Sequence, residues 1–281
     1  MGRPGEVEDL VERLRIQSQP PCEIVVSAVR ESDVGVLTQA SDVRLIFGPA
    51  GLCAQRNRTL EHLLGRCDVI AFFDDDYLPN VGAIEGLSRL FAENPDVAGA
   101  GGYLLADGVN FGGIERAEVF RMLAEYERKA PAAYRVFCDT IALYGCNMAF
   151  RAAAIGEDRF DEDLPLYAWQ EDFDFSARIA GKGRLVTTDA FAGVHRGVKG
   201  ARSPGVRLGY SQVANPIYLV RKGTMQASYA RKIILGNMLA NHARAIRPEP
   251  WIDRVGRVRG NWLAMFEAAR GRLHPRRILD L

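Results

Sequence analysis

The chain has 281 residues, of which 48% are hydrophobic and 25% are charged, a composition that predicts a folded globular protein with a substantial core. Its 36 Lys and Arg against 35 Asp and Glu leave a net charge of +1, so the total charge gives no indication of nucleic-acid binding. No apolar run reaches the ~20 residues that a membrane-spanning helix needs. The five cysteines contain no C-x-x-C pair, which argues against a disulfide framework or a cysteine zinc site and suits a reducing cytosol.

Helix and strand signals alternate along the first hundred residues. Apolar residues at i, i+3, i+4 and i+7 indicate amphipathic helices, and short apolar runs rich in β-branched residues indicate buried strands. Helices are expected over residues 5–16, 51–65 and 81–91, and strands over residues 23–29, 43–47, 69–73 and 97–105. This alternation predicts an α/β sheet that helices cover on both faces.

Three carboxylates follow directly after the third expected strand. Asp74, Asp75 and Asp76 stand at its carboxyl end, which is the edge where open α/β sheets bind ligands. Two carboxylates ~6 Å apart repel by roughly 3 kcal/mol at an effective dielectric of about 20, so the cluster favours a bound cation such as Mg²⁺ or Mn²⁺. The alternative is a solvated turn in which one Asp caps the helix that starts near Val81.

A second acidic cluster opens an expected helix between aromatic residues. Enclosure by aromatic side chains can raise the pKa of a carboxyl group and prepare one of the three acids, Glu171, Asp172 or Asp174, as a general base. The alternative is an ordinary negative first turn in which Asp174 pairs with Arg178 at i+4. Further along the chain, His195 would complete a metal site together with the upstream acids.

Taken in order, these segments resemble a bacterial glycosyltransferase of family 2, which has the GT-A fold. The matching segments cover most of the chain and read GRPGEVEDLVERLRIQSQPPCEIVVSA, GPAGLCAQRN, FFDDDYLP (the D-x-D motif), GCNMAFR and WQEDFDFSARI. The resemblance implies a mixed, mainly parallel sheet flanked by helices in a catalytic domain of residues 1–220. Its nucleotide-binding half would span about residues 1–105 and its acceptor half about 106–220, followed by a basic helical extension over residues 221–281.

The resemblance also implies roles for individual residues. Asp172 would be the catalytic base, with Glu171 beside it, while Asp76 and His195 would hold Mn²⁺ or Mg²⁺. The donor would contact the remaining site residues, which are Ser27, Arg56, Asp74, Asp75 and Gly145. Ser27 departs from the pattern, because relatives often carry at that position an Asp that grips uracil. The base of the nucleotide is therefore left open.

The implied reaction is the inverting transfer of a sugar from a nucleotide-diphosphate sugar to an acceptor hydroxyl, on a lipid-linked glycan of cell-surface polysaccharide synthesis. The Gln-x-x-Arg-Trp motif of processive members is missing, so the resemblance favours single addition. One alternative is a degenerate sugar-nucleotide-binding module without activity. Another is an Asp-based phosphatase, against which Leu78 occupies a position that needs a hydroxyl or β-branched residue.

Residues 221–281 carry 13 Lys and Arg but four Asp and Glu, a net charge of +9. Helices are expected over residues 226–245 and 257–272. The second contains an apolar stripe of Trp262, Met265, Phe266 and Ala269. We expect this stripe to pack against the catalytic domain. The alternative is peripheral docking of the tail on anionic lipid at the inner membrane face of a cytoplasmic protein.

Two further expectations concern the chain's start and one loop. In the GT-A fold the first strand lies inside the sheet, so the resemblance implies a strand before Met1 and therefore an earlier start site or an incomplete module. Without that strand, residues 24–29 and 69–73 would face each other across a gap with unpaired backbone groups. The segment 193–209 is rich in glycine and basic residues, which indicates either an exposed loop or a mobile lid over the diphosphate.

Overall fold

The computed structural model describes residues 2–129, 133–198 and 204–281. The chain forms two compact units, each described here by itself. The first consists of Met1–Ala50, Gln55–Arg159 and Arg178–Ala201, and the second of Gly51–Ala54, Phe160–Ala177 and Arg202–Leu281, within the described residues. The expected domain boundary after residue 220 stays a prediction.

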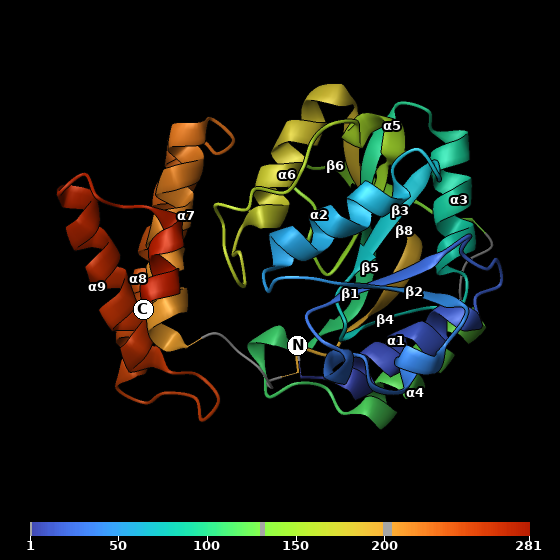
Figure 1. Ribbon diagram of the computed structural model, residues 1–281, viewed down its shortest axis with the longest axis horizontal. Coiled ribbons are helices and arrows are strands. Elements are labelled where there is room, and N and C mark those ends of the chain that lie inside the picture. The colour runs from blue at the N-terminus through green and yellow to red at the C-terminus, as the bar shows by residue number, and fades with distance from the viewer. Residues whose placement is uncertain (1, 130–132, 199–203) are drawn as a thin grey trace. The chain divides into compact units, whose positions relative to one another are not determined.

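Six strands among the described residues of the first unit form one sheet in the order β3–β7–β5–β8–β4, with β6 also paired to β8 (Figure 1). The strands are β3 (Val69–Phe73), β4 (Tyr77–Pro79), β5 (Val97–Asp107), β6 (Val136–Asp139), β7 (Asn147–Arg151) and β8 (Arg184–His195). Because β3 and β5 are both antiparallel to β7, and β5 is parallel to β8, the strands β3, β5 and β8 run in one direction. The strands β4, β6 and β7 run against them. The predicted α/β architecture with a mixed sheet and flanking helices is confirmed, and this sheet holds equal numbers of strands in each direction.

Two further strands form a small sheet of their own. β1 (Ile24–Ala28) and β2 (Val43–Phe47) are parallel, and within the described residues neither is hydrogen-bonded to the six-stranded sheet. β3 stands at the edge of that larger sheet, with β7 as its partner. The strands at residues 24–28 and 69–73 therefore belong to separate sheets, and the expected gap between them stays a prediction. Where the natural chain starts stays a prediction.

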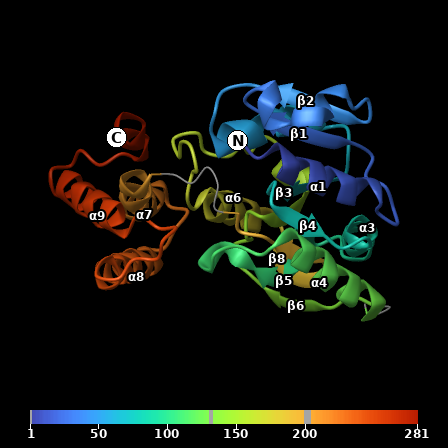
Figure 2. The ribbon, with the colours of Figure 1, turned by 90° about the horizontal axis from the view of Figure 1, so that it is seen from below.

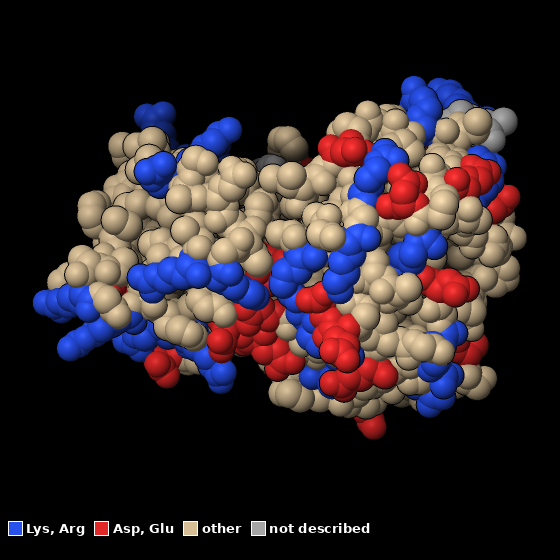
Figure 3. Space-filling view, turned by 90° about the horizontal axis from the view of Figure 1, so that it is seen from above, with Lys and Arg blue, Asp and Glu red and all other residues tan. Residues whose placement is uncertain are grey.

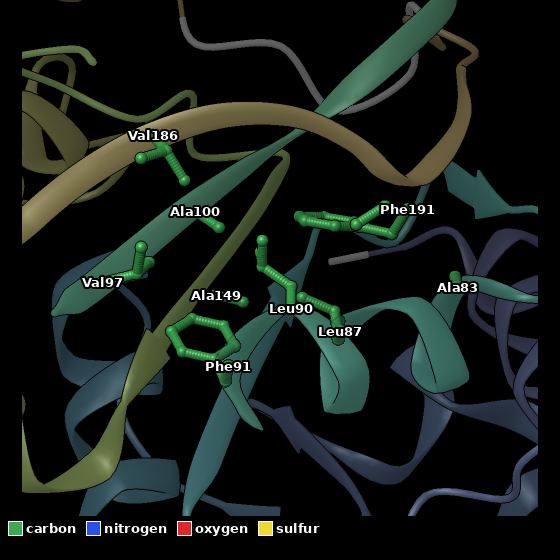
Figure 4. Packing of buried hydrophobic residues seen from close by; sticks show 10 residues of the cluster. Ala83, Leu87, Leu90, Phe91, Val97, Ala100, Ala149, Val186 and Phe191 are labelled. Carbon is green, nitrogen blue, oxygen red and sulfur yellow. The ribbon is translucent and has the colours of Figure 1, made fainter. Parts of the chain in front are cut away.

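Helices flank the two sheets of the first unit, and apolar side chains on several of these helices pack against strands. These helices are α1 (Pro4–Arg15), α2 (Leu52–Leu63), α3 (Ala83–Glu93), α4 (Arg116–Lys129) and the short α5 (Ala152–Ile155). In Figure 4, Leu87, Leu90 and Phe91 of α3 point toward Val186 and Phe191 of β8. Leucine and valine side chains of α4 pack in the same way on β4 and β8. This packing holds the strand ends that carry the acidic residues.

The second unit contains three long helices, α7 (Gly205–Lys222), α8 (Ala227–Ala245) and α9 (Arg254–Ala269), which lie side by side (Figure 2). α6 (Glu171–Ile179) begins in this unit. Short 3-10 helices connect elements of both units at Glu31–Asp33, Gly35–Gln39, Gly108–Asn110, Ala180–Lys182 and Pro275–Asp280. The expected loop 193–209 is shorter than predicted, because β8 continues to His195 and α7 begins at Gly205. The rest of the expected lid includes residues 199–203, which lie outside the described residues.

The apolar stripe of α9 is exposed on the second unit, and its expected packing against the catalytic domain stays a prediction. Trp262 is 57% exposed and Phe266 is 51% exposed. α9 instead buries small and polar residues, namely Arg254, Gly256, Gly260, Asn261 and Ala264. A Cβ atom on Gly260 would lie 2.1 Å from the carbonyl oxygen of Val206, so the two backbones approach more closely than any larger residue allows. The backbone contact, rather than the apolar stripe, decides which side of α9 faces α7.

Candidate active site

Three side chains that could hold a metal ion meet at the carboxyl end of β3. Asp74, Asp76 and His195 each offer one ligand atom, and these three atoms lie within 4.8 Å of one another. Asp76 and His195 are buried, while Asp74 is partly exposed. Two carboxylates and an imidazole form a donor set that suits Mn²⁺, and the carboxylates also suit Mg²⁺. The structure thus brings both predicted metal ligands together with one predicted donor residue.

Backbone pairing places His195 beside Asp76. β4 and β8 are antiparallel with Tyr77 opposite His195, and the Arg196 N–H donates to the carbonyl oxygen of Asp76 at 2.9 Å. The Tyr77 N–H donates to the Asp74 carbonyl oxygen at 2.9 Å, which closes a tight turn between β3 and β4. The cluster is therefore built by strand register and main-chain hydrogen bonds, which fix the positions of its side chains.

His195 lies between two carboxylates. Its Nδ1 is 2.9 Å from Asp107 Oδ1, and its Nε2 is 3.4 Å from Asp76 Oδ1. Burial lowers the pKa of His195, but its hydrogen bonds to Asp107 and Asp76 outweigh this and raise the pKa to about 10. For Asp76, burial raises the pKa, while the hydrogen bond and charge of His195 and the charge of Arg3 bring it down to about 2. Imidazolium and carboxylate thus stabilise each other, and His195 must lose its proton before Nε2 can bind a metal.

Asp75, predicted to contact the donor, is ion-paired with Arg3. Arg3 also reaches the metal-site acid, since its Nη1 lies 3.2 Å from Asp76 Oδ2. Burial raises the pKa of Asp75 to about 6 even though Arg3 opposes the shift. The Val198 N–H also donates to Asp76 Oδ2, at 2.8 Å. The side chain of Asp75 therefore belongs to an ion pair beside the three-ligand cluster.

Arg56 on α2 links two of the predicted donor residues. Its Nη2 donates to the carbonyl oxygen of Gly145 at 2.8 Å and lies 3.2 Å from Asp74 Oδ1. The guanidinium is buried, so it supplies a fixed positive charge next to the acids. Ser27, at the end of β1, is tied to the same helix, because Arg58 Nη2 donates to its hydroxyl at 3.3 Å.

The predicted base lies in the second unit, at the first turn of α6. Glu171 is buried and Asp172 is half-buried. Asp174 is completely buried, and it accepts hydrogen bonds from Lys222 at 2.8 Å and Thr224 at 2.7 Å. These two partners give Asp174 a structural role in joining α6 to the end of α7.

The segment that leads into α6 is strained. Leu166, Ala168 and Gln170 have φ angles of 58°, 52° and 76°, in the left-handed region that residues other than glycine rarely adopt. The Asn215 side chain holds this segment by donating to the Trp169 carbonyl oxygen at 2.7 Å. Gln170 Oε1 is buried and has no hydrogen-bond partner among the described residues. Strain of this kind collects at binding and catalytic segments, which makes the approach to Glu171 and Asp172 a candidate for function.

Two residues of the site were missed by sequence reasoning. Asp107 ends β5 directly opposite His195 in the parallel β5–β8 ladder, and it orients the imidazole through Nδ1. The strand-end argument that identified the acids at 74–76 would have found Asp107, had the expected strand not ended at residue 105. Arg3 carried no such signal, because its contact with Asp75 depends on how α1 packs on the sheet.

No protein-family model and no curated protein matches the chain by sequence. Solved structures do match. The mannosyltransferase PcManGT from Pyrobaculum calidifontis, in complex with GDP-Man and Mn²⁺, is 18% identical with a TM-score of 0.52, over 95% of this chain and 79% of its own. GalNAc-T7 with UDP, GalNAc and Mn²⁺ is 14% identical with a TM-score of 0.51, over 95% of this chain, which spans 52% of the GalNAc-T7 chain. The likeness shows the GT-A fold that the sequence motifs predicted.

Proposed function

We propose that the protein is an inverting glycosyltransferase that moves a sugar from a nucleotide-diphosphate sugar to an acceptor hydroxyl. The observation that carries the proposal is the cluster of Asp74, Asp76 and His195 at the end of β3, in a fold shared with transferases whose structures hold GDP-Man or UDP together with Mn²⁺. In such a site the carboxyl end of the central strands faces the ligand. The assignment to bacterial family 2 belongs to the same proposal.

The donor set fits a divalent cation. Asp74, Asp76 and His195 would hold it, and Asp107 would keep Nδ1 of the imidazole engaged so that Nε2 faces the ion. When bound, Mn²⁺ or Mg²⁺ supplies Lewis-acid stabilisation of the negative charge on the diphosphate leaving group. Arg56 adds a permanent positive charge beside Asp74. In this proposal, Ser27, Asp75 and Gly145 contribute to the donor pocket.

Asp172 acts as the general base in this proposal, with Glu171 beside it. It accepts the proton of the acceptor hydroxyl as the hydroxyl oxygen attacks the anomeric carbon and the diphosphate leaves. A single carboxylate base, without an enzyme nucleophile, gives in-line displacement with inversion of the anomeric centre. The strained segment from Leu166 to Gln170 supports this role, because a rigid, over-determined backbone can hold the base in one position.

The acceptor in this proposal is a lipid-linked glycan of cell-surface polysaccharide synthesis, and the protein works from the cytoplasmic side of the membrane. Among the described helices, none is both long and apolar enough to cross a bilayer. The proposal includes peripheral contact with lipid, and a net charge of +9 over residues 221–281 supports attraction to anionic headgroups.

The test begins with the full chain and a panel of UDP-, GDP- and dTDP-sugars, with and without Mn²⁺, read by thermal unfolding. A donor at 100 times its Kd adds ~2.7 kcal/mol to the stability of the folded state. We expect one donor to stabilise the protein in the presence of Mn²⁺, and Asp76→Asn to abolish this effect. If no nucleotide sugar stabilises the protein in the presence of a divalent metal, the proposal is wrong.

Asp172→Asn separates binding from chemistry. We expect it to keep the donor-dependent thermal shift but to lower sugar transfer by about 10³-fold, within the range for the loss of a general base. Asp96→Asn is the matched control, because Asp96 is an exposed acid paired with Arg184 and should leave both readouts unchanged. Transfer by Asp172→Asn at the parental rate would overturn the assignment of the base. Donor binding without turnover in the parent would instead identify a degenerate binding module.

A further inference from the structure

The outer side of α8 and α9 carries large apolar side chains in solvent. On α8 and its end, Leu239 is 70% exposed and Ile246 is 84% exposed, and on α9 Trp262 and Phe266 are more than half exposed. We call this surface the α8–α9 face, formed by Leu235, Leu239, Ile246, Trp262, Met265 and Phe266. Single exposed apolar residues are ordinary on protein surfaces, but a group of this size marks an interaction site.

The two helices contribute to one continuous face. Trp262 Nε1 donates to His242 Nε2 at 2.9 Å, and the two rings meet edge to face with centroids 6.0 Å apart. His242 stands three residues after Leu239 and four before Ile246, so it lies on the same side of α8 as both. The His242–Trp262 contact thus joins the apolar stripe of α8 to that of α9.

The interior of the same helices combines an apolar cluster with buried amide side chains. Asn241, Asn261 and Gln212 are buried and bonded to one another, with Asn241 Nδ2 at 2.8 Å from Gln212 Oε1 and 3.0 Å from Asn261 Oδ1. Arg254 donates to Asn241 Oδ1 at 3.0 Å.

Five exposed basic residues lie on α8 and α9 or directly after these helices. No carboxylate among the described residues is ion-paired with Arg231, Lys232, Arg247, Arg259 or Arg270. Arg270 instead stacks over the ring of Phe266, with its Cζ 3.6 Å from the ring centroid. Figure 3 shows Lys and Arg bordering uncharged surface on the second unit. An aromatic and aliphatic surface edged by unpaired cations is complementary to an anionic lipid interface.

We infer that the α8–α9 face docks on the surface of an anionic membrane, with its apolar side chains among the acyl chains and its Arg and Lys at the headgroups. This inference rests on the proposed function, because docking on a membrane would bring a lipid-linked acceptor to the enzyme. Its test is independent, because lipid binding is measured without donor, acceptor or metal.

The experiment is flotation of the full chain with vesicles of phosphatidylcholine alone or with about one-third phosphatidylglycerol. We expect binding to the anionic vesicles only, a decrease with added salt, and quenching of Trp262 fluorescence by lipids brominated in the acyl chain. The double variant Leu239→Ser/Phe266→Ser should weaken binding at least about tenfold, because each side chain loses its transfer into an apolar phase.

The matched control is Ile16→Ser/Val36→Ser, which removes two apolar side chains of similar exposure, 56% and 64%, from the first unit. It should bind vesicles like the parent. Absence of anionic vesicle binding by the parent overturns the inference. So does equal loss of binding in both double variants. A concentration-dependent dimer in light scattering that Leu239→Ser/Phe266→Ser dissociates, without vesicle binding by the parent, would assign the face to a second copy instead.

Discussion

Helix α3 of the first unit and helix α9 of the second bury different kinds of residue. In the first, α3 turns Leu87, Leu90 and Phe91 inward onto the sheet, and polar groups gather at the strand ends. In the second, α9 turns Gly260 and Asn261 inward and leaves Trp262 in solvent. An apolar stripe therefore shows which residues of a helix share a face, but it does not show what that face meets.

The two units also differ in where they place their buried polar side chains. The buried acids of the first unit stand at the edge of a sheet, where a ligand can reach them, and their charge is balanced by His195 and Arg3. The buried amides of the second unit satisfy one another inside the helix bundle. The first arrangement is suited to binding an ion, whereas the second fixes how three helices pack.

The largest effect on stability is expected from filling the helix contact of the second unit. Gly260→Val places a Cβ within 2.1 Å of a backbone oxygen that cannot move aside, so we expect a loss of about 3 kcal/mol and early hydrogen exchange in α7 and α9. Gly236→Ala is the control, because no atom lies within 4 Å of its new methyl group, and it should gain roughly 0.5–1 kcal/mol. Parental stability of Gly260→Val would show that these backbones are not in close contact.

A smaller effect, on metal affinity, is expected from removing the carboxylate that orients His195. Asp107→Asn removes the carboxylate that holds His195 Nδ1, and the loss of such a positioning partner typically lowers metal affinity about 10–100-fold. Titration calorimetry with Mn²⁺ at fixed pH measures this directly. Asp139→Asn, at an exposed ion pair with Arg184, is the control. An unchanged Mn²⁺ affinity in Asp107→Asn would mean that His195 is not a ligand.

The smallest effect is a pH dependence in the presence of EDTA. The folded-state pKa of His195 is raised to about 10 from 6.5, so its ion pairs stabilise the fold fully below about pH 6.5 and are lost as the pH rises toward 10. We expect the free energy of unfolding to fall by about 1–2 kcal/mol between pH 7 and 9. His195→Gln should lack this decline. A parental slope in that variant would assign the titration to another group.

The sequence predicted those parts of the site whose local residue pattern matches their place in the fold. The strand ending at Phe73 and the acids after it were found because a buried strand is a short apolar run and a sheet edge collects polar ends. The strand at Tyr77–Pro79 was missed, because three residues are too few for a periodic signal. That short strand is important for the site, because its antiparallel pairing with β8 places His195 beside Asp76.

Other parts of the site depend on contacts that no local pattern records. Ala168 has a left-handed backbone conformation, which a sequence usually signals by a glycine. Here the residue is alanine, and contacts with the surrounding structure hold the backbone in this conformation. The outward turn of Trp262 follows from backbone contact at Gly260, which involves residues more than 50 positions apart in the chain. The local sequence pattern identified the acids after Phe73, whereas the orientation of the helices required coordinates.

The left-handed residues ahead of α6 also have an engineering consequence. Glycine or asparagine at Ala168 would relieve about 1 kcal/mol of unfavourable torsion, so a screen for heat resistance would select such replacements first. The same replacements would increase the backbone flexibility of the segment before Asp172. Under the proposed function, substitutions at residues 166–170 that raise thermal stability would lower turnover, so these five positions are best kept unchanged when the protein is stabilised.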